Sequence, residues 1–493
     1  MADIIISKFR FIKHSNMNEN LAKTSFWSTI WMFTDTIATK AIAFIIGIVL
    51  ARLLSPSDFG IIGMMLVFTS LCDVIIESGT ANALIRKTDR NESDCSTAFF
   101  LNICIAFVAY ILLFCFSHLI AEFYKEPIIA QLLKVAGLNV VLNALCIVPN
   151  ALLIANFKTK KQAKVNFLAN ALSGISALAL AYNGMGIWAL VFQTVFANLI
   201  KVIGYWLSAK WHPSLIYSKQ SLIYLWNYSS KSFLIGLLGT FFANIYNLLV
   251  GKIYSKVELG YFARANQFAQ LPSTILSSTF QKVSVATFAN LQNDITHLLD
   301  VYRKYVHVIS FVSFSMFFYL AIISKPLILI LLTEKWVVCS PMLSLISIGC
   351  AFSPLGIINL CLLQAINRMD YSLRLEIRKK IVFVAILLCS IPFGIMSMIC
   401  GSVIYNIVAT GMNLSCSYRF IGYRYKDQLA DIAKYLFTAI IATLCSIVIY
   451  NFIDNVYLLF ISITISFWGI YLGTAYMRKF PVMDYLRNLK RNI

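Results

Sequence analysis

Residues 30–50 read IWMFTDTIATKAIAFIIGIVL, an apolar run of membrane length that contains an aspartate and a lysine. A helix of about 20 apolar residues can cross the hydrocarbon core of a bilayer. Asp35 and Lys40 would each cost about 2.5–3.5 kcal/mol at the centre of such a helix. Charged residues kept at this cost normally face a water-filled path or one another. The stretch therefore predicts a transmembrane helix with a polar side.

The composition of the whole chain is that of a multi-pass membrane protein. Of its 493 residues, 59% are hydrophobic and 13% are charged, and the mean hydropathy is +0.78. Soluble domains carry about a quarter charged residues. The twelve cysteines lie mostly in apolar runs without C-x-x-C or zinc spacing, which indicates packing residues. The first residues, MADIIISKFRFIKH, are no signal peptide and predict an interfacial anchor or a basic tail.

Hydrophobic stretches predict an all-α fold with fourteen transmembrane helices, because each stretch is close to the length that a membrane span needs. The predicted spans are 29–50, 59–80, 96–117, 128–153, 165–183, 186–208, 230–250, 259–281, 305–332, 340–364, 380–396, 398–418, 434–451 and 455–476. No connection between them is long enough to fold as a separate soluble domain.

The positions of the basic residues orient these spans. With the N-terminus inside, thirty of the 41 lysines and arginines fall in inner segments, five in outer loops and six within spans. Cytoplasmic loops carry such an excess of positive charge. We therefore predict that both termini are cytoplasmic. The net charge of +20 follows mostly from this topology. No basic module with interleaved aromatic residues predicts nucleic-acid binding.

A short internal repeat predicts two six-helix halves. The first outer turn reads ARLLSPSDFG (51–60), and the turn 200 residues later reads GKIYSKVELG (251–260). Each stretch would join the first and second helices of a half, as in a parallel repeat. Asp58 and Glu258 precede helix starts, where a carboxylate can cap N–H groups. The predicted segments are an N-terminal segment 1–28, an N-lobe 29–208, a cytoplasmic linker 209–229, a C-lobe 230–418, two further helices within 419–476 and a tail 477–493.

Ionisable residues within the spans gather in the first two helices of each half. These residues are Asp35, Lys40, Asp73, Glu77, Lys231 and Arg264. Asp35 and Lys40 are five residues apart, about 140° around a helix, so each needs a partner on another helix. Asp73 and Glu77 share one helix face at a depth similar to that of Asp35, and two close carboxylates raise one pKa. The three carboxylates are therefore candidates for coupling to a proton or sodium ion, or for a static ion-pair cluster.

The three cations have a separate prediction. By the span limits, Lys231 lies at the cytoplasmic mouth, Lys40 near the midplane and Arg264 in the outer part of the membrane. We expect them to form a ladder that binds a pyrophosphate at three depths; the alternative is that Lys40 neutralises Asp35 or Asp73. Lys134, Lys201 and Lys325 lie nearer span ends, where a long side chain can reach the membrane surface.

Three segments carry a resemblance to a known family. They are LARLLSPSDFGIIGM (50–64), LGYFARANQFAQLPSTILSSTFQKVSVATFANLQND (259–294) and GMGIWALVFQ (184–193). The chain resembles the Wzx-type flippases, and most of all the WzxC-like lipopolysaccharide biosynthesis proteins, in the multidrug/oligosaccharidyl-lipid/polysaccharide exporter superfamily. The resemblance covers essentially the whole chain.

The resemblance implies a two-lobed transporter that exports undecaprenyl-pyrophosphate-linked glycans across the bacterial cytoplasmic membrane by alternating access. It implies lipid-linked oligosaccharide and membrane lipids as partners, with other polysaccharide-assembly proteins, and no cofactor apart from a coupling H⁺ or Na⁺. The sequence holds no nucleophile–base pair and no P-loop. Two alternatives stay open: a cation-coupled drug antiporter of the same superfamily, and a membrane glycan polymerase or ligase, for which the predicted outer loops are short.

Overall fold

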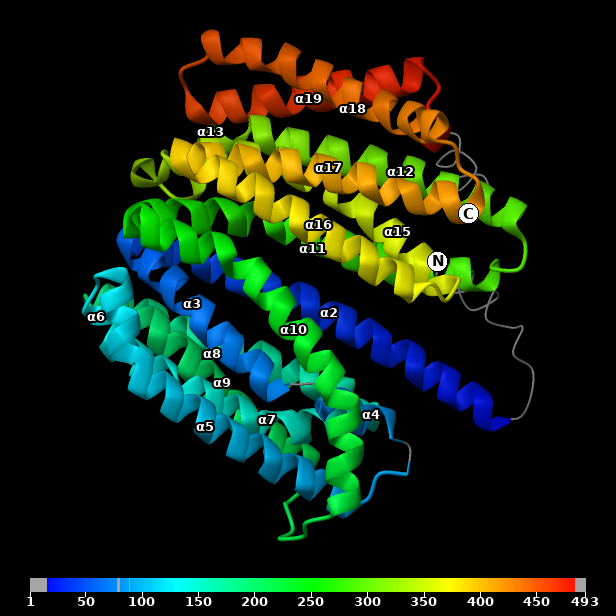
Figure 1. Cartoon of the computed structure of the whole chain (residues 1–493). Helices are drawn as coiled ribbons and strands as arrows, with labels where there is room; N and C mark the ends of the chain where they lie inside the picture. The colour runs from blue at the N-terminus through cyan, green and yellow to red at the C-terminus, as the bar shows by residue number, and fades with distance from the viewer. Residues whose placement is uncertain (1–15, 78–79, 88, 484–493) are drawn as a thin grey trace. The chain divides into compact units, whose positions relative to one another are not determined.

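The computed structural model describes residues 16–77, 80–87 and 89–483, and all regular structure in these ranges is helical (Figure 1). The chain divides into two compact units after Gly260. The first unit contains α2 (Asn16–Leu53), α3 (Pro56–Glu77), α4 (Thr80–Arg86), α5 (Glu92–Tyr124), α6 (Ile128–Ala136), α7 (Leu138–Ala155), α8 (Thr159–Tyr182), α9 (Trp188–Ala209) and α10 (Lys219–Ile253).

The second unit begins within the first turns of α11 (Lys256–Asn290). It continues with α12 (Ile295–Ile322), α13 (Ser324–Leu331), α14 (Cys339–Cys350), α15 (Ser353–Ala365), α16 (Met369–Ser390), α17 (Ile395–Ile421), α18 (Tyr425–Ile447) and α19 (Val456–Met477). Short 3₁₀ turns, among them η2 (Glu334–Trp336), join some of these helices. The predicted linker 209–229 is irregular only over 210–218, because α10 already begins at Lys219.

Twelve of the fourteen predicted spans are confirmed as helices that are long and apolar enough to cross a membrane. The other two predicted spans, 259–281 and 380–396, fall on α11 and α16. These helices have 35 and 22 residues, which is sufficient length. Within the described residues, these two helices are not apolar enough to be identified as membrane spans, because polar and charged residues lower their hydropathy. A fourteen-span membrane fold is therefore not confirmed, and the crossing of α11 and α16 stays a prediction.

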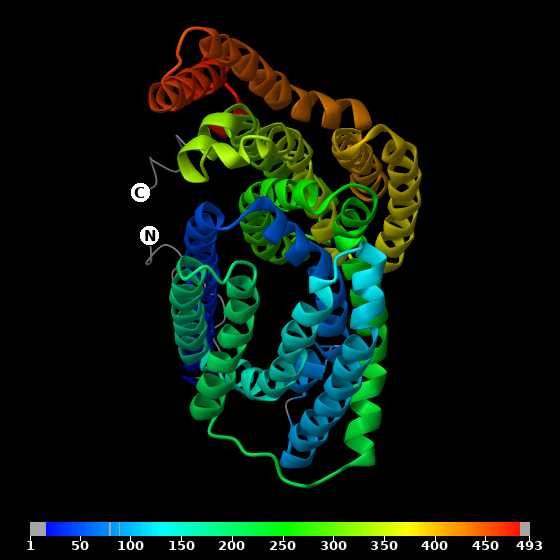
Figure 2. The same cartoon turned by 90° about the vertical axis from the view of Figure 1, so that its left-hand side faces the viewer.

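Small residues let the helices of the first unit approach closely. α2 packs on α8, and α8 packs on α9 (Figure 2). A Cβ at Gly174 in α8 would come within 1.8 Å of the Ile46 side chain in α2. A Cβ at Gly204 in α9 would come within 2.6 Å of Val165 in α8. Close approach at small residues is how membrane helices gain van der Waals contact, since lipid provides no hydrophobic drive.

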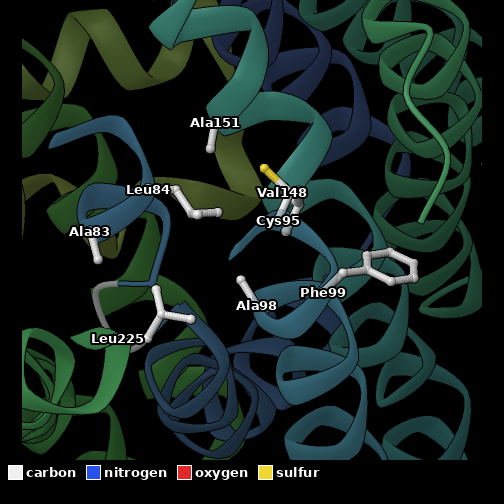
Figure 3. Packing of buried hydrophobic residues seen from close by; sticks show 8 residues of the cluster. All are labelled: Ala83, Leu84, Cys95, Ala98, Phe99, Val148, Ala151 and Leu225. Carbon is white, nitrogen blue, oxygen red and sulfur yellow. The ribbon is translucent and has the colours of Figure 1, made fainter. Parts of the chain in front are cut away.

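A buried cluster anchors α10 to the first unit. Its members come from four helices, α4, α5, α7 and α10, and are labelled in Figure 3. The cluster contains Ala83, Leu84, Cys95, Ala98, Phe99, Val148, Ala151 and Leu225. Next to it, Trp211 in the 210–218 connection donates a hydrogen bond to Glu92 at 3.0 Å. Ser218 of the same connection donates through its backbone N–H to Thr97 at 3.1 Å. The connection is thus held on the start of α5.

In both repeat turns a serine hydroxyl caps the N–H of the acidic residue three positions later, and the predicted carboxylate cap of a backbone N–H is observed at Asp58. In the first turn, the Asp58 carboxylate accepts from the Ser55 backbone N–H at 2.9 Å, and the Ser55 hydroxyl accepts from the Asp58 N–H at 3.4 Å. In the second turn, Ser255 donates its hydroxyl to Glu258 and accepts from the Glu258 N–H at 3.1 Å. Each carboxylate also lies in the first turn of its helix, where it faces the positive end of the helix dipole.

An ionic cluster joins α18 to α12 in the second unit. The buried Asp431 accepts from Arg303 Nε at 2.5 Å, from Tyr423 at 2.6 Å and from Lys434 at 3.1 Å. His307 Nε2 lies 3.7 Å from the same carboxylate. Burial, together with the hydrogen bond to Asp431, raises the pKa of Tyr423 above its usual value. The cluster therefore fixes the first of the two C-terminal helices to α12.

Candidate functional site

Asp35 in α2 takes part in a hydrogen-bond network that joins α2, α8 and α9. Its carboxylate accepts from Asn166 Nδ2 in α8 at 2.9 Å and from Thr39 at 3.2 Å. Asn166 in turn accepts from the Tyr205 hydroxyl in α9 at 2.6 Å. Asp35 thus has a partner on another helix, as the sequence analysis expected. The network satisfies a charged group inside an apolar helix bundle.

Asp73 in α3 has its partners on other helices. Its carboxylate accepts from Asn143 Nδ2 in α7 at 2.7 Å, and the charge of Lys201 in α9 acts on it. Glu77, the last residue of α3, is exposed and feels the charge of Asp73, as expected for residues on one helix face. Asp35 and Asp73 thus bond to α8 and α7 respectively. The structure describes no hydrogen bond that joins the two carboxylates.

Lys201 is the clearest residue that the sequence misplaced. Its ammonium group lies 3.5 Å from Asn198 Oδ1 and interacts electrostatically with Asp73. Asn198 donates to Asn139 at 3.0 Å, and Asn139 donates to Thr194 at 3.0 Å. The side chain therefore faces the polar interior between α7 and α9, and the predicted extension to the membrane surface is wrong for this lysine. A polar face on α9, with Thr194, Asn198 and Lys201 three or four residues apart, is the signal that could have revealed it.

The predicted cations lie in different surroundings. Lys40 is partly buried on α2, and Lys231 falls within α10 at a position whose side chain lies outside the described part of the structure. Arg264 in α11 is buried and donates from Nη1 to Gln267 at 2.5 Å. Its guanidinium lies 5.9 Å from the Trp336 ring, which is within range of a cation–π interaction. Arg264 thus contributes to packing in the second unit as well as carrying charge.

A polar, partly charged interior in the first unit is what these contacts have in common. Asp35, Asp73, Lys201 and the asparagines come from five helices, α2, α3, α7, α8 and α9, whose outer faces are apolar. No group of three or more His, Cys, Asp or Glu side chains in the described ranges could hold a metal ion. The arrangement can bind a small cation or a proton, or present hydrogen-bond donors to a polar solute.

The model of the polysaccharide biosynthesis protein family matches residues 49–341, more than half of the chain. The chain belongs to this family. Among its relatives, the succinoglycan biosynthesis transport protein ExoT of Rhizobium meliloti is 24% identical over 66% of this chain and 66% of its own length. The lipopolysaccharide biosynthesis protein WzxC of Escherichia coli is 22% identical over 77% of this chain and 78% of its own length.

Solved structures show the fold of this family member. The lipid II flippase MurJ in an inward closed conformation is similar with a TM-score of 0.73, at 15% identity, over 92% of this chain and 99% of MurJ. An inward-facing multidrug transporter of the MATE family has a TM-score of 0.60 at 13% identity, over 78% of this chain and 95% of its own. The fold is that of the multidrug/oligosaccharidyl-lipid/polysaccharide exporters. The expectation of a multi-pass membrane transporter, and not an enzyme, is confirmed.

Proposed function

We propose that this protein is a flippase for undecaprenyl-pyrophosphate-linked oligosaccharides, the repeat units of an O-antigen, capsule or exopolysaccharide. It moves them from the cytoplasmic to the outer leaflet of the bacterial cytoplasmic membrane by alternating access, with both termini in the cytoplasm. The observation that carries this proposal is membership of the polysaccharide biosynthesis protein family, with ExoT and WzxC among the relatives. The polar interior of the first unit supports it.

The chemistry of such a substrate fits the residues available. A pyrophosphate is an anion that must cross about 30 Å of hydrocarbon. Lys231, Lys40 and Arg264 lie at successive depths by the predicted topology, and each would bind it in turn. Lysine acts as a point charge, and arginine can form two parallel hydrogen bonds to phosphate oxygens. In this proposal Arg264 exchanges its contact with Gln267 for the substrate when the protein opens outward.

We further propose that the carboxylates of the first unit couple transport to a proton or sodium ion. Asp73 accepts from Asn143 and faces the charge of Lys201, and Asp35 accepts from Asn166. A change in the charge of either group would alter the hydrogen bonds that join α2 to α8 and α3 to α7. Binding of an ion would then favour one arrangement of the helices over another, which is how a ligand shifts a conformational equilibrium.

A deletion strain tests the flippase directly. The lipid-linked oligosaccharide should accumulate on the cytoplasmic face of the membrane and disappear when the intact chain is expressed again. The side of accumulation can be measured with a membrane-impermeant glycosidase on oriented vesicles. A deletion strain with a normal surface glycan and no accumulated intermediate would contradict the proposal.

A cation-coupled drug antiporter is the second candidate, because the fold is also that of the MATE transporters and Asp35 lies in a polar network on α2. Deletion would then increase sensitivity to cationic drugs and leave the surface glycan unchanged. Measuring both phenotypes in one strain separates the two functions. Other polysaccharide-assembly proteins would be partners only under the first.

A further inference from the structure

A polar cavity of about 230 Å³ lies within the second unit, between α15, α16 and α17. None of the residues predicted from the sequence as site residues contributes to it. Its polar lining residues are Ser353, Asn359, Ser372, Glu376, Lys379, Tyr405, Asn406, Thr410 and Asn413. The apolar part of the wall includes Leu360, Leu375 and Ala409. On the predicted topology the cavity belongs to the cytoplasmic half of these helices, because α15 ends and α16 begins at the basic inner loop.

The charge in this cavity is balanced. Lys379 is only 9% exposed and forms an ion pair with Glu376, one turn earlier on α16. An anion in the cavity would meet the Glu376 carboxylate, and a small cation would meet the Lys379 ammonium. The pair is neutral overall, so it supplies no net charge that would attract a charged ligand. It leaves several donors and acceptors that can bind a neutral polar molecule.

The Asn413 amide faces the cavity and is available to a ligand there. Its side chain is 7% exposed and lines the cavity, and among the described residues it has no hydrogen-bond partner. Gly356 makes room for it, because a Cβ there would come within 2.7 Å of Asn413 Nδ2. Asn406 lies two turns before Asn413 on α17. Its Nδ2 donates to the Ser402 carbonyl, which leaves its Oδ1 available to a ligand.

We propose that this cavity binds one neutral sugar ring of the transported glycan. The proposal rests on the flippase function proposed above and names the part of the substrate that the second unit recognises. A sugar ring presents hydroxyl groups that both donate and accept, and amides and hydroxyls bind such groups in both senses. It also presents a face of C–H groups that packs on an aromatic ring. Tyr405 supplies that ring, held in an edge contact with Phe383 at 5.0 Å.

The location and the chemistry together define a selectivity site. The glycan reaches the transporter from the cytoplasm, and the cavity belongs to the cytoplasmic half of its helices. A sugar ring without a suitably placed hydroxyl group would leave Asn413 unpaired and would lose the hydrogen bonds that the correct sugar ring forms. Sites built on hydrogen bonding strongly reject analogues that lack the hydrogen-bonding group. The cavity therefore discriminates between repeat units, whereas the pyrophosphate is common to all of them.

A matched pair of substitutions on α17 tests the site. Ala409→Phe fills the cavity from its wall, whereas Ile407→Phe adds the same ring at a position that is 46% exposed and does not line the cavity. Asn413→Leu removes the unpaired amide with little change in volume. The full chain in nanodiscs is titrated with millimolar glucose, galactose, N-acetylglucosamine and N-acetylgalactosamine, and binding is detected by saturation-transfer NMR.

We expect at least one sugar to bind the wild type and Ile407→Phe equally and to bind Ala409→Phe and Asn413→Leu at least tenfold more weakly. No binding of any sugar to the wild type, or equal binding to Ala409→Phe, would overturn the proposal. If the deletion strain accumulates the cytoplasmic intermediate but no sugar binds the purified protein, the proposed flippase function stands and the sugar site in the cavity is refuted. Sugar binding that the cavity variants abolish, in a strain without the intermediate, refutes the flippase function and with it the link between this cavity and a transported glycan.

Discussion

Gly60 in α3 lies directly against the backbone of Lys256, so that a Cβ at Gly60 would come within 1.7 Å of the Lys256 carbonyl oxygen. The repeated turn makes the same contact in reverse: a Cβ at Gly260 would come within 1.8 Å of the Pro56 carbonyl oxygen. The two helix starts thus pack symmetrically through glycines 200 residues apart. The identity of these glycines in both halves follows from the space available, because no other residue lets the backbones approach so closely.

Gly60→Ala should therefore destabilise the protein strongly. Neither backbone can move away without disturbing the capped helix starts, and overpacking of this kind typically costs about 1–3 kcal/mol or more. We expect a lower melting temperature of the purified protein and less protein in the membrane. Gly239→Ala in α10 is the control, because a Cβ there meets nothing within 4 Å. It should be neutral or stabilise by up to about 1 kcal/mol. Equal stability of both variants would contradict the packing described.

Local features of this fold were predictable, and contacts between distant segments were not. The capping at Asp58 and Glu258 follows from residues three positions apart, and twelve helices follow from continuous apolar runs. α11 and α16 were predicted as spans although polar and charged residues lower their hydropathy, and their crossing of the membrane stays a prediction. The Asp35–Asn166 bond joins residues 131 positions apart. A lone asparagine in an apolar helix gives no sign of which helix it will meet.

The interior of the first unit shows the same limit. Asp73 was recognisable as a buried charge, but its partners Asn143 and Lys201 lie on α7 and α9 and come together only in the folded bundle. The polar cavity of the second unit is built from side chains on three helices, and its residues come together only in the folded chain. Any specificity of such a surface depends on side chains that meet only in the folded protein, which is why the sequence alone does not reveal it.

The Lys87–Asp94 ion pair predicts a defined effect on stability. Lys87 Nζ contacts the buried Asp94 carboxylate at 2.7 Å, and Ser221 of α10 donates to the same carboxylate at 2.6 Å. Lys87→Met would leave Asp94 without a cation and should cost about 2 kcal/mol, somewhat less than loss of a fully buried pair. Thermal unfolding of the purified variants measures the cost. Adding Asp94→Asn should recover part of it; a double variant as unstable as the sum of both would contradict a direct interaction.

The same pair fixes the sign of a pH effect. The hydrogen bond to Asp94 raises the pKa of Lys87 above its usual value. Because the pKa is higher in the folded state, the charged lysine stabilises the protein fully below the unfolded-state pKa of about 10.4. This stabilisation is lost as the pH rises through the folded-state pKa. The stability difference between wild type and Lys87→Met should stay constant from about pH 6 to 9 and shrink above about pH 10.4. A difference that shrinks already between pH 7 and 9 would show that another group titrates.

The crossing of α16 can be tested by cysteine labelling from the outside of intact cells. Single cysteines at Asp370 and Phe393, both exposed at opposite ends of α16 and the following turn, are introduced after the native cysteines are removed. Only position 393 should react with an impermeant reagent. Ser372 is unsuitable because it is buried. Cysteines introduced at Asn293, after α11, and at Asp454, after α18, are tested in the same way. Of these two, only the cysteine at position 454 should react with the impermeant reagent. Labelling at 370 would remove α16 from the transmembrane helices.

Ion coupling makes a prediction about the carboxylates. Asp35→Asn, Asp73→Asn and Glu77→Gln should each reduce ion-driven glycan export by at least tenfold, because a neutral side chain cannot bind and release the coupling ion. The amide variants keep the shape of the hydrogen-bonded sites, so the amount of protein in the membrane should stay unchanged. Asp454→Asn, in an exposed loop between α18 and α19, is the control. Full export by all three variants would leave these carboxylates a structural role only.

Lys40 offers the sharpest test of how the substrate is held. If Lys40 only balances a carboxylate, removing both charges should restore function, because an unpaired buried charge is the costly state. Asp35 is already satisfied by Asn166 and Thr39, which favours a separate role for the lysine. Lys40→Gln should therefore stop glycan export even when combined with Asp35→Asn or Asp73→Asn, and Lys40→Arg should keep part of the activity. Export is measured as surface glycan in the complemented deletion strain, with the amount of each variant in the membrane as the control. Recovery of export in either double variant would rule out Lys40 as a ligand of the pyrophosphate.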